Sequence, residues 1–329
     1  MSNAFPATEW IWADGEIVRW QDATLHVMSH VVHYGSSVFE GMRAYATKQG
    51  RMYFRYAEHM QRLRESAAIY RMEYPWTDDQ LRSATSELME RNGLEGSYVR
   101  PIVLRGLGAA GIDPVSSPVH VFVVVWNWGA YLGPEALEKG VDAGVSSWFR
   151  PAPNTHPSMA KAGGNYLNSS LMKMEAKRNG YDEAIALSVD GLVSEGSGQN
   201  LFLVKNGVLY TPSVDASFLH GITRDSIIKV AGDLGVEVKE THVPRESLYV
   251  ADEVFFCGTA SEVTPVRSVD RWQIGEGKRG PVTGKIQERF LAIVRGEYPD
   301  RHGWLTPAVP EKGAKPEKSP GTSRAGARA

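Results

Sequence analysis

The stretch from residue 154 to residue 170, NTHPSMAKAGGNYLNSS, contains a lysine placed where it could do chemistry. Lys161 is followed by Gly163 and Gly164, and paired glycines let another molecule approach the backbone closely. A lysine shielded from water loses its charge more easily, and its free amine is then a nucleophile for carbonyl groups. The alternative is a solvated surface lysine beside a flexible turn, since most lysines are exposed. A phosphate loop of the GxxxxGK type is excluded because the lysine precedes the glycines.

Other stretches contain groups that would complement such a lysine. VSEGSGQN places Glu195 at the end of a short strand, in a glycine-rich turn. LHGITRDS opens a helix at Ile222 and Thr223, where backbone N–H groups and the helix dipole form an anion site. FFCGTASE ends a strand near Thr259, and this small-residue turn can supply further donors. With Lys161, these groups describe a site for a phosphorylated aldehyde: an amine for the carbonyl, a carboxylate for a protonated ring nitrogen, and amides for the phosphate.

The order and spacing of several motifs point to a family. The motifs, in chain order, are HYGSSVFEGMR, EHMQRL, YVRP, AKAGGNY, SEGSGQN, GITRDS and CGTASE. In these motifs the chain resembles the pyridoxal-phosphate enzymes of fold type IV, and within that group the branched-chain-amino-acid aminotransferases. The resemblance covers residues 10 to about 304. It implies an α/β (α+β) fold, with a small α/β domain and a larger domain that has an antiparallel, barrel-like core. It also implies a homodimer or a higher oligomer built from dimers.

The resemblance implies pyridoxal 5'-phosphate as cofactor and gives roles to individual residues. Lys161 would hold it as a Schiff base and later shuttle a proton between the substrate Cα and the cofactor C4′. Glu195 would pair with the pyridine nitrogen, and Tyr166 would donate to the ring hydroxyl oxygen. The phosphate would be held by Arg62, Ile222, Thr223 and Thr259. Outside the family context, Arg62 is more typical of a surface ion pair and Tyr166 of a core aromatic.

The resemblance also implies a substrate site that accepts both a branched alkyl group and a carboxylate. The amino-acid carboxylate would be bound by Tyr98, Thr259 and Ala260. The side-chain pocket would comprise Phe39, Gly41, Trp128 and Tyr131, although its aromatics could instead be ordinary core or interface residues. Arg100 would neutralise the distal carboxylate of glutamate from the edge of the apolar wall, because a buried unpaired charge is costly when leucine binds. The partner subunit would contribute Tyr34 and the GIDP loop near Ile112.

The implied reaction is ping-pong transamination of L-leucine, L-isoleucine and L-valine with 2-oxoglutarate, giving branched-chain 2-oxo acids and L-glutamate. Alternatives within the same fold are a D-amino-acid or (R)-amine transaminase and an aminodeoxychorismate lyase. The combination of HYGSSVFEGMR with YVRP favours the L-branched-chain type. A non-catalytic cofactor carrier would need no proton shuttle, so the joint presence of Lys161, Glu195, Arg62 and Tyr166 argues against it. Nucleotide binding is disfavoured because no GxGxxG follows a predicted strand.

Composition and charge agree with a small-molecule enzyme. The 329 residues are 42% hydrophobic and 22% charged, and a formal net charge of -2 gives no basic field for nucleic acid. The single cysteine excludes a disulfide framework within the chain. MSNAFPATEW lacks the pattern of a signal peptide, and the most apolar run, residues 119–126, is too short to span a bilayer. We therefore expect a cytoplasmic protein with no nucleic-acid, membrane or metal partner.

Periodicity and turn residues predict the elements that position these motifs. The first part should contain hairpins at residues 10–20 and 36–54, helices at 55–70 and 77–92, and strands at 97–105 and 119–126. The second should contain a strand at 141–149, a helix ending near 178, and two hairpins that turn at Asp190-Gly191 and Asn206-Gly207. Further strands and helices should follow at 222–234, 236–243, 253–259, 266–272 and 282–295.

These elements suggest two domains and a tail. We predict a small domain over residues 1–126, a linker over 127–134, a large cofactor-binding domain over 135–305 and a disordered tail over 306–329. Many relatives carry Glu where this chain has Gln199, a change expected to adjust the surroundings of Glu195 without abolishing activity. Cys257 is expected to be a buried small hydrophobe, and His30 and His33 to pack or hydrogen-bond without catalysing.

Overall fold

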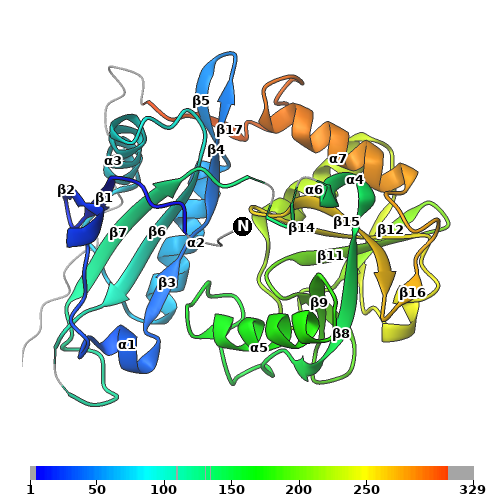
Figure 1. Cartoon of the computed structure of the whole chain (residues 1–329), viewed down its shortest axis with the longest axis horizontal. Helices are drawn as coiled ribbons and strands as arrows, with labels where there is room; N and C mark the ends of the chain where they lie inside the picture. Colours follow the sequence, from blue (N-terminus) through cyan, green and yellow to red (C-terminus); the bar gives the residue numbers. More distant parts are fainter. Residues whose placement is uncertain (1–4, 109, 130, 134, 310–329) are drawn as a thin grey trace, which may run out of the picture.

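The computed structural model describes residues 5–108, 110–129, 131–133 and 135–309, and its strands form two sheets that lie side by side (Figure 1). The first is an eight-stranded sheet in the order β17-β5-β4-β6-β7-β1-β2, with β3 paired beside β6. All its pairings among the described residues are antiparallel. Its strands are β1 (Trp10–Ala13), β2 (Glu16–Arg19), β3 (Ser37–Phe39), β4 (Met42–Thr47), β5 (Gly50–Phe54), β6 (Ser97–Arg105), β7 (Val119–Trp126) and β17 (Leu305–Pro307).

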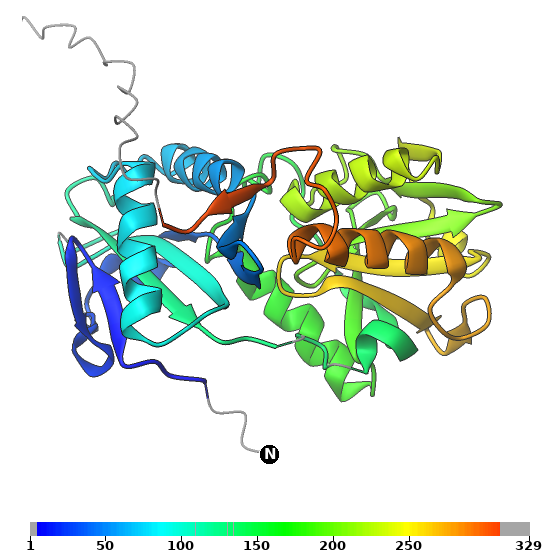
Figure 2. The ribbon, with the colours of Figure 1, turned by 90° about the horizontal axis from the view of Figure 1, so that it is seen from above.

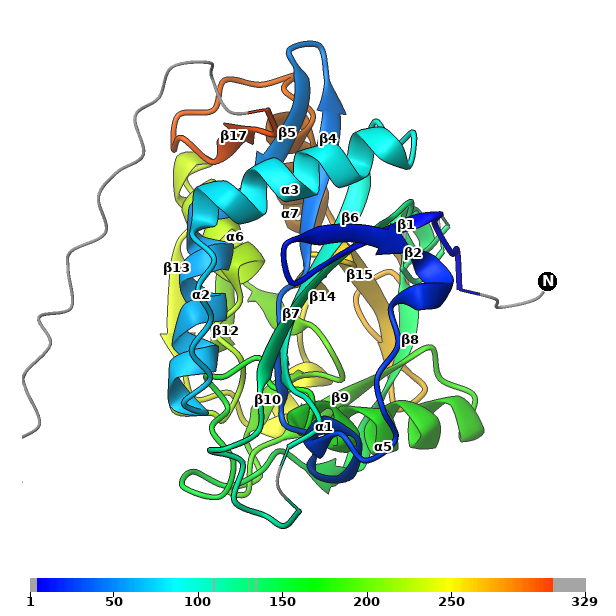
Figure 3. The same cartoon turned by 90° about the vertical axis from the view of Figure 1, so that its left-hand side faces the viewer.

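The two helices predicted for this half, at residues 55–70 and 77–92, are confirmed as α2 (Tyr56–Ile69) and α3 (Asp78–Arg91). The short helices η1 (Trp20–Asp22) and α1 (His30–Tyr34) are not among the predicted elements. Helix α3 starts where the sequence predicts because Thr77 accepts from the Gln80 amide while the Gln80 side chain accepts from the Thr77 amide, a capping box. The helix covers the first sheet on the side turned away from the second (Figure 3).

The second sheet has nine strands in the order β10-β9-β8-β15-β14-β11-β12-β13, with β16 paired to β15. They are β8 (Val141–Phe149), β9 (Glu183–Leu187), β10 (Val193–Gly196), β11 (Asn200–Lys205), β12 (Val208–Pro212), β13 (Val238–Thr241), β14 (Glu253–Gly258), β15 (Glu262–Val269) and β16 (Trp272–Gln273). The two predicted hairpins are confirmed, and Gly191, Asn206 and Gly207 have the positive φ that such turns require. The sheet is curled and mixed, since β8 pairs in parallel with both neighbours and β12 with β13.

Helices flank this curled sheet. They are α4 (Ala136–Lys139), α5 (Asn165–Arg178), α6 (Ile222–Asp233), η2 (Arg245–Leu248) and α7 (Pro281–Val294). Helix α5 packs against β8 and β9, whereas α6 and α7 pack against β14. In Figure 1 these two groups lie at opposite ends of the second half. Helix α5 follows directly from the Lys161 loop, and α6 begins at the predicted anion site. The Lys161 loop and the start of α6 line a cavity to which both sheets contribute residues.

Apolar packing holds each half together and joins them. In the first half, α2 and α3 bury Leu63 and Leu88 against the sheet. A fully buried leucine contributes roughly 1.5–3 kcal/mol relative to an exposed one. In the second half, α6 and α7 form a cluster that also takes in Phe54 and Trp304 from outside that half. The Phe54 and Phe290 rings meet edge to face at 5.4 Å, so the two halves share one core at this point.

The predicted strand over residues 36–45 is interrupted, which corrects the sequence interpretation. Strands β3 and β4 are separate, and β3 pairs with β6 while β4 pairs with β5 and β6. The interruption falls at Glu40 and Gly41. Glu40 is fully buried, and the Glu40 amide donates to the Pro101 carbonyl oxygen at 2.9 Å. The break turns the Glu40 side chain into the interior, where it has the polar partners described below.

The prediction that the disordered tail begins at residue 306 is also wrong. Thr306 and Pro307 belong to β17, which pairs with β5, and Ala308 is buried. Figure 2 shows this segment running from the end of α7 back to the first sheet. Proline is tolerated there because β17 is an edge strand. Residues 310–329 lie outside the described residues, and the division into domains with a linker at 127–134 stays a prediction. Among the described residues, no helix is long and apolar enough to cross a membrane.

Candidate active site

A cavity of about 260 Å³ lies where the Lys161 loop, the turn after β10, the start of α6 and the turn after β14 come together. Both sheets contribute to its walls. The residues predicted for the cofactor and the substrate all line it, with the exception of Tyr34 and Ile112. They are Phe39, Gly41, Arg62, Tyr98, Arg100, Trp128, Tyr131, Lys161, Tyr166, Glu195, Ile222, Thr223, Thr259 and Ala260. Motifs far apart in the sequence therefore form one site.

The backbone of the lysine loop is attached to the first half. The Lys161 amide donates to Ser66 Oγ at 3.0 Å, and its carbonyl accepts from the Phe39 amide at 3.0 Å. The next residues continue the contact, since the Gly163 amide donates to the Ser37 carbonyl oxygen at 2.9 Å. A Cβ on Gly163 would lie only 2.4 Å from Ser37 Oγ, so a larger residue here would force the Ser37 hydroxyl to move. The loop thus holds the lysine against β3.

The Lys161 side chain is enclosed by aromatic groups. Its Nζ lies 2.7 Å from Tyr166 Oη, to which it donates a hydrogen bond. The same nitrogen is 5.1 Å from the centre of the Phe39 ring and 5.2 Å from that of Tyr166. Tyr166 comes from the first turn of α5, which fixes its position relative to the lysine. An amine in direct contact with a phenol at the wall of a cavity is suited to carbonyl and proton-transfer chemistry.

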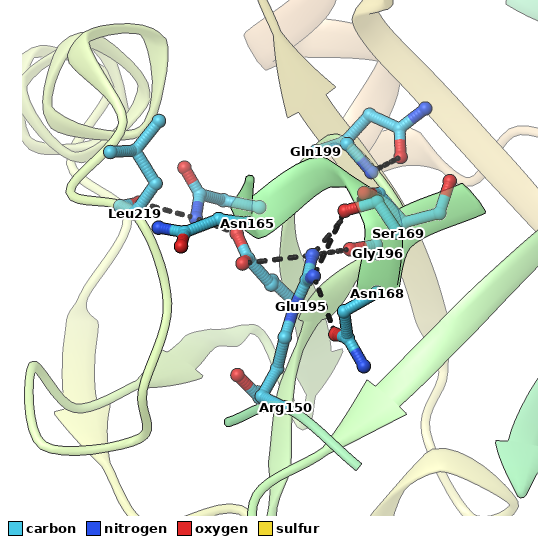
Figure 4. Close-up of polar contacts among 12 residues, drawn as sticks. Arg150, Asn165, Asn168, Ser169, Glu195, Gly196, Gln199 and Leu219 are labelled. Atoms are coloured by element: carbon cyan, nitrogen blue, oxygen red, sulfur yellow. Dashed lines mark hydrogen bonds and ion pairs between the residues drawn. The ribbon is translucent and has the colours of Figure 1, made fainter. Parts of the chain in front are cut away.

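Glu195 stands at the end of β10 as a buried carboxylate. Its Oε1 lies 3.0 Å from a guanidinium nitrogen of Arg150, and its Oε2 is 3.4 Å from Asn200 Nδ2. Asn200 is itself held by donation to the Leu219 carbonyl oxygen at 3.0 Å. Burial raises the pKa of Glu195, and the charges of Arg150 and Lys161 oppose that rise. Figure 4 shows the Glu195 carboxylate beside the Arg150 guanidinium. A carboxylate here can hold a protonated heterocyclic nitrogen.

Arg62 is part of a buried polar network that the sequence alone does not show. Its Nε and one terminal nitrogen donate to the two Glu40 oxygens at 2.6 and 2.9 Å, and the other terminal nitrogen donates to the His220 carbonyl oxygen at 2.9 Å. His59 Nδ1 lies 2.7 Å from the same carboxylate. Burial would raise the pKa of Glu40, but Arg62 and His59 hold it far below its usual range. Burial lowers the pKa of His59. The network aims Arg62 at the start of α6.

The start of α6 and the turn after β14 offer backbone N–H groups to the cavity. Helix α6 begins at Ile222 after Gly221, and no described side chain caps it. A Cβ on Gly221 would come within 1.9 Å of Asn200 Oδ1, so a larger residue would displace the Asn200 side chain from its hydrogen bond to the Leu219 carbonyl oxygen. On the other side, the carbonyl oxygens of Thr259 and Ala260 both accept from Arg43, at 2.9 and 3.2 Å. With Arg62 nearby, this arrangement is an anion site.

The predicted substrate pocket is a group of aromatic rings around one arginine. The rings of Tyr98 and Trp128 meet edge to face at 4.8 Å, and those of Trp128 and Tyr131 at 5.5 Å. The Arg100 guanidinium lies 4.6 Å from the centre of the Phe39 ring, and one of its nitrogens is 3.4 Å from Tyr98 Oη. Stacking on an aromatic face keeps the charge of Arg100 partly compensated within an apolar wall.

Gly41 is the point where substitution should change this pocket most directly. A Cβ at position 41 would lie 1.9 Å from Tyr98 Oη and 2.7 Å from its Cζ. We predict that Gly41→Ala displaces Tyr98 and raises KM for the amino-acid substrate that the family resemblance implies by about tenfold or more, on the order of one lost hydrogen bond to a charged group. Steady-state kinetics would measure this, with cofactor content unchanged. Gly232→Ala, whose Cβ meets nothing within 4 Å, is the matched control and should leave KM as in the wild type.

Tyr34 and Ile112 are the predicted residues that the cavity of this chain does not include. Both are exposed, Tyr34 at 50% and Ile112 at 80%. Their assignment to a partner subunit's site stays a prediction. His30 is buried and lies 2.7 Å from Ser36 Oγ and 3.2 Å from the Ile112 carbonyl oxygen, which makes it a structural histidine. His26 and His30 are four residues apart, yet no group of three metal-ligating side chains occurs among the described residues.

Gln199 and Cys257 have distinct surroundings beside the cavity. Gln199 Nε2 donates at 2.9 Å to Glu183, a fully buried carboxylate that also accepts from Lys173 and Ser197. A glutamate at position 199 would face this carboxylate directly, so the amide suits this environment. Burial raises the pKa of Cys257 to about 12, which leaves its thiol protonated.

Sequence reasoning missed three charged residues of the site. Glu40 and Arg43 lie within HYGSSVFEGMR. The sequence does not show that Glu40 pairs with Arg62, or that Arg43 donates to four backbone carbonyl oxygens. Arg150 follows β8 in WFRPAP, a sequence with no distinctive pattern. A charged side chain inside one of the quoted motifs is a signal that could have marked Glu40 and Arg43 as site residues. Arg150 lies outside those motifs and has no such signal.

Comparisons with known proteins agree with this geometry. A family model described as amino-transferase class IV matches residues 37–269. The branched-chain-amino-acid aminotransferase of Salmonella typhimurium is 55% identical over 300 residues, covering 91% of this chain and 97% of its own. The solved Escherichia coli branched-chain amino acid aminotransferase superposes with a TM-score of 0.90 at 53% identity, covering 92% of this chain and 100% of that one. The enzyme of that name from Thermobaculum terrenum, solved in its PLP form, gives 0.85 at 33% identity, with 93% and 100% covered.

Fold, site and relatives define the class. The chain belongs to the class IV aminotransferases, because the family model covers most of it and the site residues lie in one cavity. Within that family it belongs to the branched-chain-amino-acid aminotransferases, to which its relatives at 54–55% identity are assigned over nearly their whole length. It is a transaminase.

Proposed function

We propose that the protein transfers the amino group of L-leucine, L-isoleucine or L-valine to 2-oxoglutarate, with pyridoxal 5'-phosphate held in the cavity between the two sheets. The observation that carries the proposal is the set of groups around this cavity. The Lys161 amine, the buried Glu195 carboxylate and the uncapped start of α6 all line it. An amine, a carboxylate and an anion site match the aldehyde, the ring nitrogen and the phosphate of this cofactor. The residues present therefore fit the group.

Each part of the cofactor would have its own partners. Glu195 would hold the proton on the pyridine nitrogen, and Tyr166 would donate to the ring hydroxyl oxygen. The phosphate would lie among Arg62, Ile222, Thr223 and Thr259, where charge-assisted and amide hydrogen bonds favour an anion. When bound, the cofactor supplies an electron sink for the charge left at the substrate Cα.

The chain's own residues would bind the substrate and move the proton. Lys161, once free, would take a proton from the substrate Cα, and its amine is held in place by a hydrogen bond to Tyr166 Oη at 2.7 Å. Tyr98 and the amides of Thr259 and Ala260 would hold the amino-acid carboxylate. Because Arg43 donates to the carbonyl oxygens of Thr259 and Ala260, this turn would be fixed before substrate arrives.

One pocket would serve both substrates through Arg100. Phe39, Trp128 and Tyr131 form an apolar wall for the branched side chain of leucine. Arg100 lies against Phe39, and its charge is partly compensated by the rings around it. This compensation keeps the cost of the arginine low when leucine is bound, while the guanidinium can still meet the distal carboxylate of 2-oxoglutarate.

We also propose a homodimer, or a higher oligomer built from dimers, in the cytoplasm. Exposed apolar side chains gather near α1 and the GIDP loop, among them Val27, Met28, Val32, Tyr34, Ile112 and Val115. Burial of these side chains against a second copy would remove apolar surface from water. It would also bring Tyr34 and Ile112 to a partner's site, as the family resemblance implies. A free cysteine is compatible with a reducing compartment.

Steady-state kinetics with paired substrates test the reaction. Varying L-leucine at several fixed concentrations of 2-oxoglutarate should give parallel double-reciprocal lines, the pattern of a ping-pong reaction. L-isoleucine and L-valine should replace L-leucine. D-leucine and amines without a carboxylate should react far more slowly, because Tyr98 and the turn at Thr259 would hold the carboxylate on one side. Preference for D-leucine or for such an amine would contradict the proposed substrate class.

A further inference from the structure

Arg150 is a buried arginine beside the cavity whose position needs an explanation. It follows β8 directly and is only 7% exposed. Its own amide donates to the Leu187 carbonyl oxygen at 2.8 Å, which continues the pairing of the sheet by one residue. Burial of a guanidinium is unfavourable unless its charge and its N–H groups are matched. The partners of Arg150 therefore indicate what it does.

The side chain of Arg150 is held by two kinds of partner. From α5, Asn168 Oδ1 and Ser169 Oγ accept from one terminal nitrogen at 3.1 and 3.0 Å. From the turn after β10, the carbonyl oxygens of Gly196 and Ser197 accept from the other at 2.9 and 3.2 Å. That second nitrogen also lies 3.0 Å from the Glu195 carboxylate. Figure 4 shows the guanidinium fixed among these groups, with one side facing Glu195.

We propose that Arg150 is the positioning residue of the reaction: it holds the Glu195 carboxylate in place and in its ionised form, so that Glu195 can keep a proton on the cofactor's ring nitrogen. This inference rests on the proposed function and assigns Arg150 no contact with the substrate. A lysine would not reproduce the arrangement, because its single ammonium cannot bind the α5 side chains, the turn carbonyls and the carboxylate together.

The electrostatic surroundings of Glu195 support this role. Two cations act on the buried carboxylate, Arg150 from the end of β8 and Lys161 from its loop, and Asn200 on β11 is its neutral hydrogen-bond donor. Lys161 takes part in the proton transfers of the reaction, so its charge changes during turnover. An arginine guanidinium, by contrast, has no role as a proton carrier in proteins. Of the two cations, only Arg150 can balance Glu195 throughout the cycle.

The test uses four variants of the full-length protein and one control. Arg150→Met removes the charge, Arg150→Lys changes its shape, and Glu195→Gln removes the carboxylate. The double variant Arg150→Met/Glu195→Gln removes both charges, so it avoids leaving a buried unpaired carboxylate. Arg267→Met is the matched control, because Arg267 forms a two-bond pair with Asp142 in the same sheet, at 2.9 and 2.7 Å, and lines no part of the cavity.

The first readout is kinetic, on the holoenzyme. Arg150→Met should lower kcat by about 10²-fold, as for loss of one fixed electrostatic group, with KM for L-leucine little changed. When kcat of Arg150→Met is plotted against pH, the fall in kcat on the acid side should occur at higher pH than in the wild type. The reason is that Glu195 ionises less readily without the guanidinium. Arg150→Lys should recover part of the loss. The double variant should be no slower than Glu195→Gln alone, because Arg150 is expected to act only through Glu195.

The second readout needs no cofactor. In apoprotein carrying Arg150→Met, the folded-state pKa of Glu195 is raised further above its unfolded value. The unfolded chain then releases this proton at a lower pH than the folded chain does. The free energy of unfolding in urea should therefore fall as pH rises above the usual range for a glutamate carboxyl group. The double variant should lack this slope, and Arg267→Met should keep the wild-type dependence on pH.

The outcomes separate this inference from the proposed function. A wild-type protein that does not transaminate L-leucine overturns the proposed function, whatever the variants show. If the wild type is active and Arg150→Met keeps the wild-type pH profile and apoprotein slope, the role of Arg150 is overturned. A double variant much slower than Glu195→Gln also overturns it, since Arg150 would then act on something other than Glu195. The role of Arg150 is supported if Arg150→Met shows both the shifted pH profile and the pH-dependent loss of stability, and if neither effect remains when Glu195→Gln is also present.

Discussion

Lys161→Ala should abolish transamination while leaving pyridoxal 5'-phosphate bound through its phosphate. The variant lacks the amine at the cavity wall, and among the described residues no other lysine lines that cavity. We expect kcat to fall by at least about 10⁴-fold, the upper range for loss of a general acid–base group. The phosphate partners, from Arg62 to Thr259, are unchanged, so the cofactor should stay in the protein as a noncovalent complex. Activity assays and dialysis followed by cofactor absorbance would measure the two effects.

The matched control is Lys177→Ala, on the exposed side of α5. Lys177 is more than half exposed and lies 3.7 Å from Asp182 across a surface pair, which contributes little. Its loss should leave both turnover and covalent attachment of the cofactor unchanged. Full turnover by Lys161→Ala would contradict the assignment of the lysine, and loss of cofactor from that variant would contradict the assignment of the phosphate site.

Glu40→Gln should give the largest loss of stability among conservative substitutions near the site. Glu40 is fully buried and accepts from Arg62 at 2.6 and 2.9 Å, with His59 Nδ1 at 2.7 Å. An amide of the same shape leaves Arg62 without its counter-charge and places an N–H group against donors. Breaking one side of a buried ion pair costs about 3 kcal/mol or more. Urea denaturation of the apoprotein should show this as a lower midpoint with the same slope.

Glu87→Gln is the control for this substitution. Glu87 pairs with Arg91 one turn later on α3, and both side chains are about half exposed. An exposed pair of this kind contributes about 0.5 kcal/mol or less. The control separates burial from the loss of an ion pair as such. A Glu40→Gln protein as stable as the wild type would show that the network around Arg62 is not a source of stability.

Much of the fold follows from local signals in the sequence. The Thr77 capping box starts α3, and the turns at Asp190-Gly191 and Asn206-Gly207 set two hairpins, because each depends on residues a few positions apart. The interruption between β3 and β4 could not be predicted from such local signals. It depends on the long-range contact of Glu40 with Arg62 and on the approach of Gly41 to Tyr98. Likewise, Thr306 and Pro307 have no strand pattern of their own and pair only because β5 presents an edge.

The residues of the site likewise include some that sequence motifs predict and others that they do not. Lys161, Glu195 and the start of α6 are apparent from motifs because their chemistry lies in the residue itself and its immediate neighbours. Arg150 is not, because an arginine after a strand is ordinary until its burial and its partner are known. Sequence patterns thus predicted groups that line the cavity, and the structure adds the charged residues that contact them.

The absorption spectrum of the purified holoenzyme tests the central claim most directly. With pyridoxal 5'-phosphate bound at Lys161, the protein should be yellow. Addition of L-leucine should bleach the visible band, 2-oxoglutarate should restore it, and D-leucine should leave it unchanged. This sequence of changes would establish the cofactor, the stereochemistry and both half-reactions in one cuvette. A protein that stays colourless with added pyridoxal 5'-phosphate, or one that only D-leucine bleaches, would contradict the assignment.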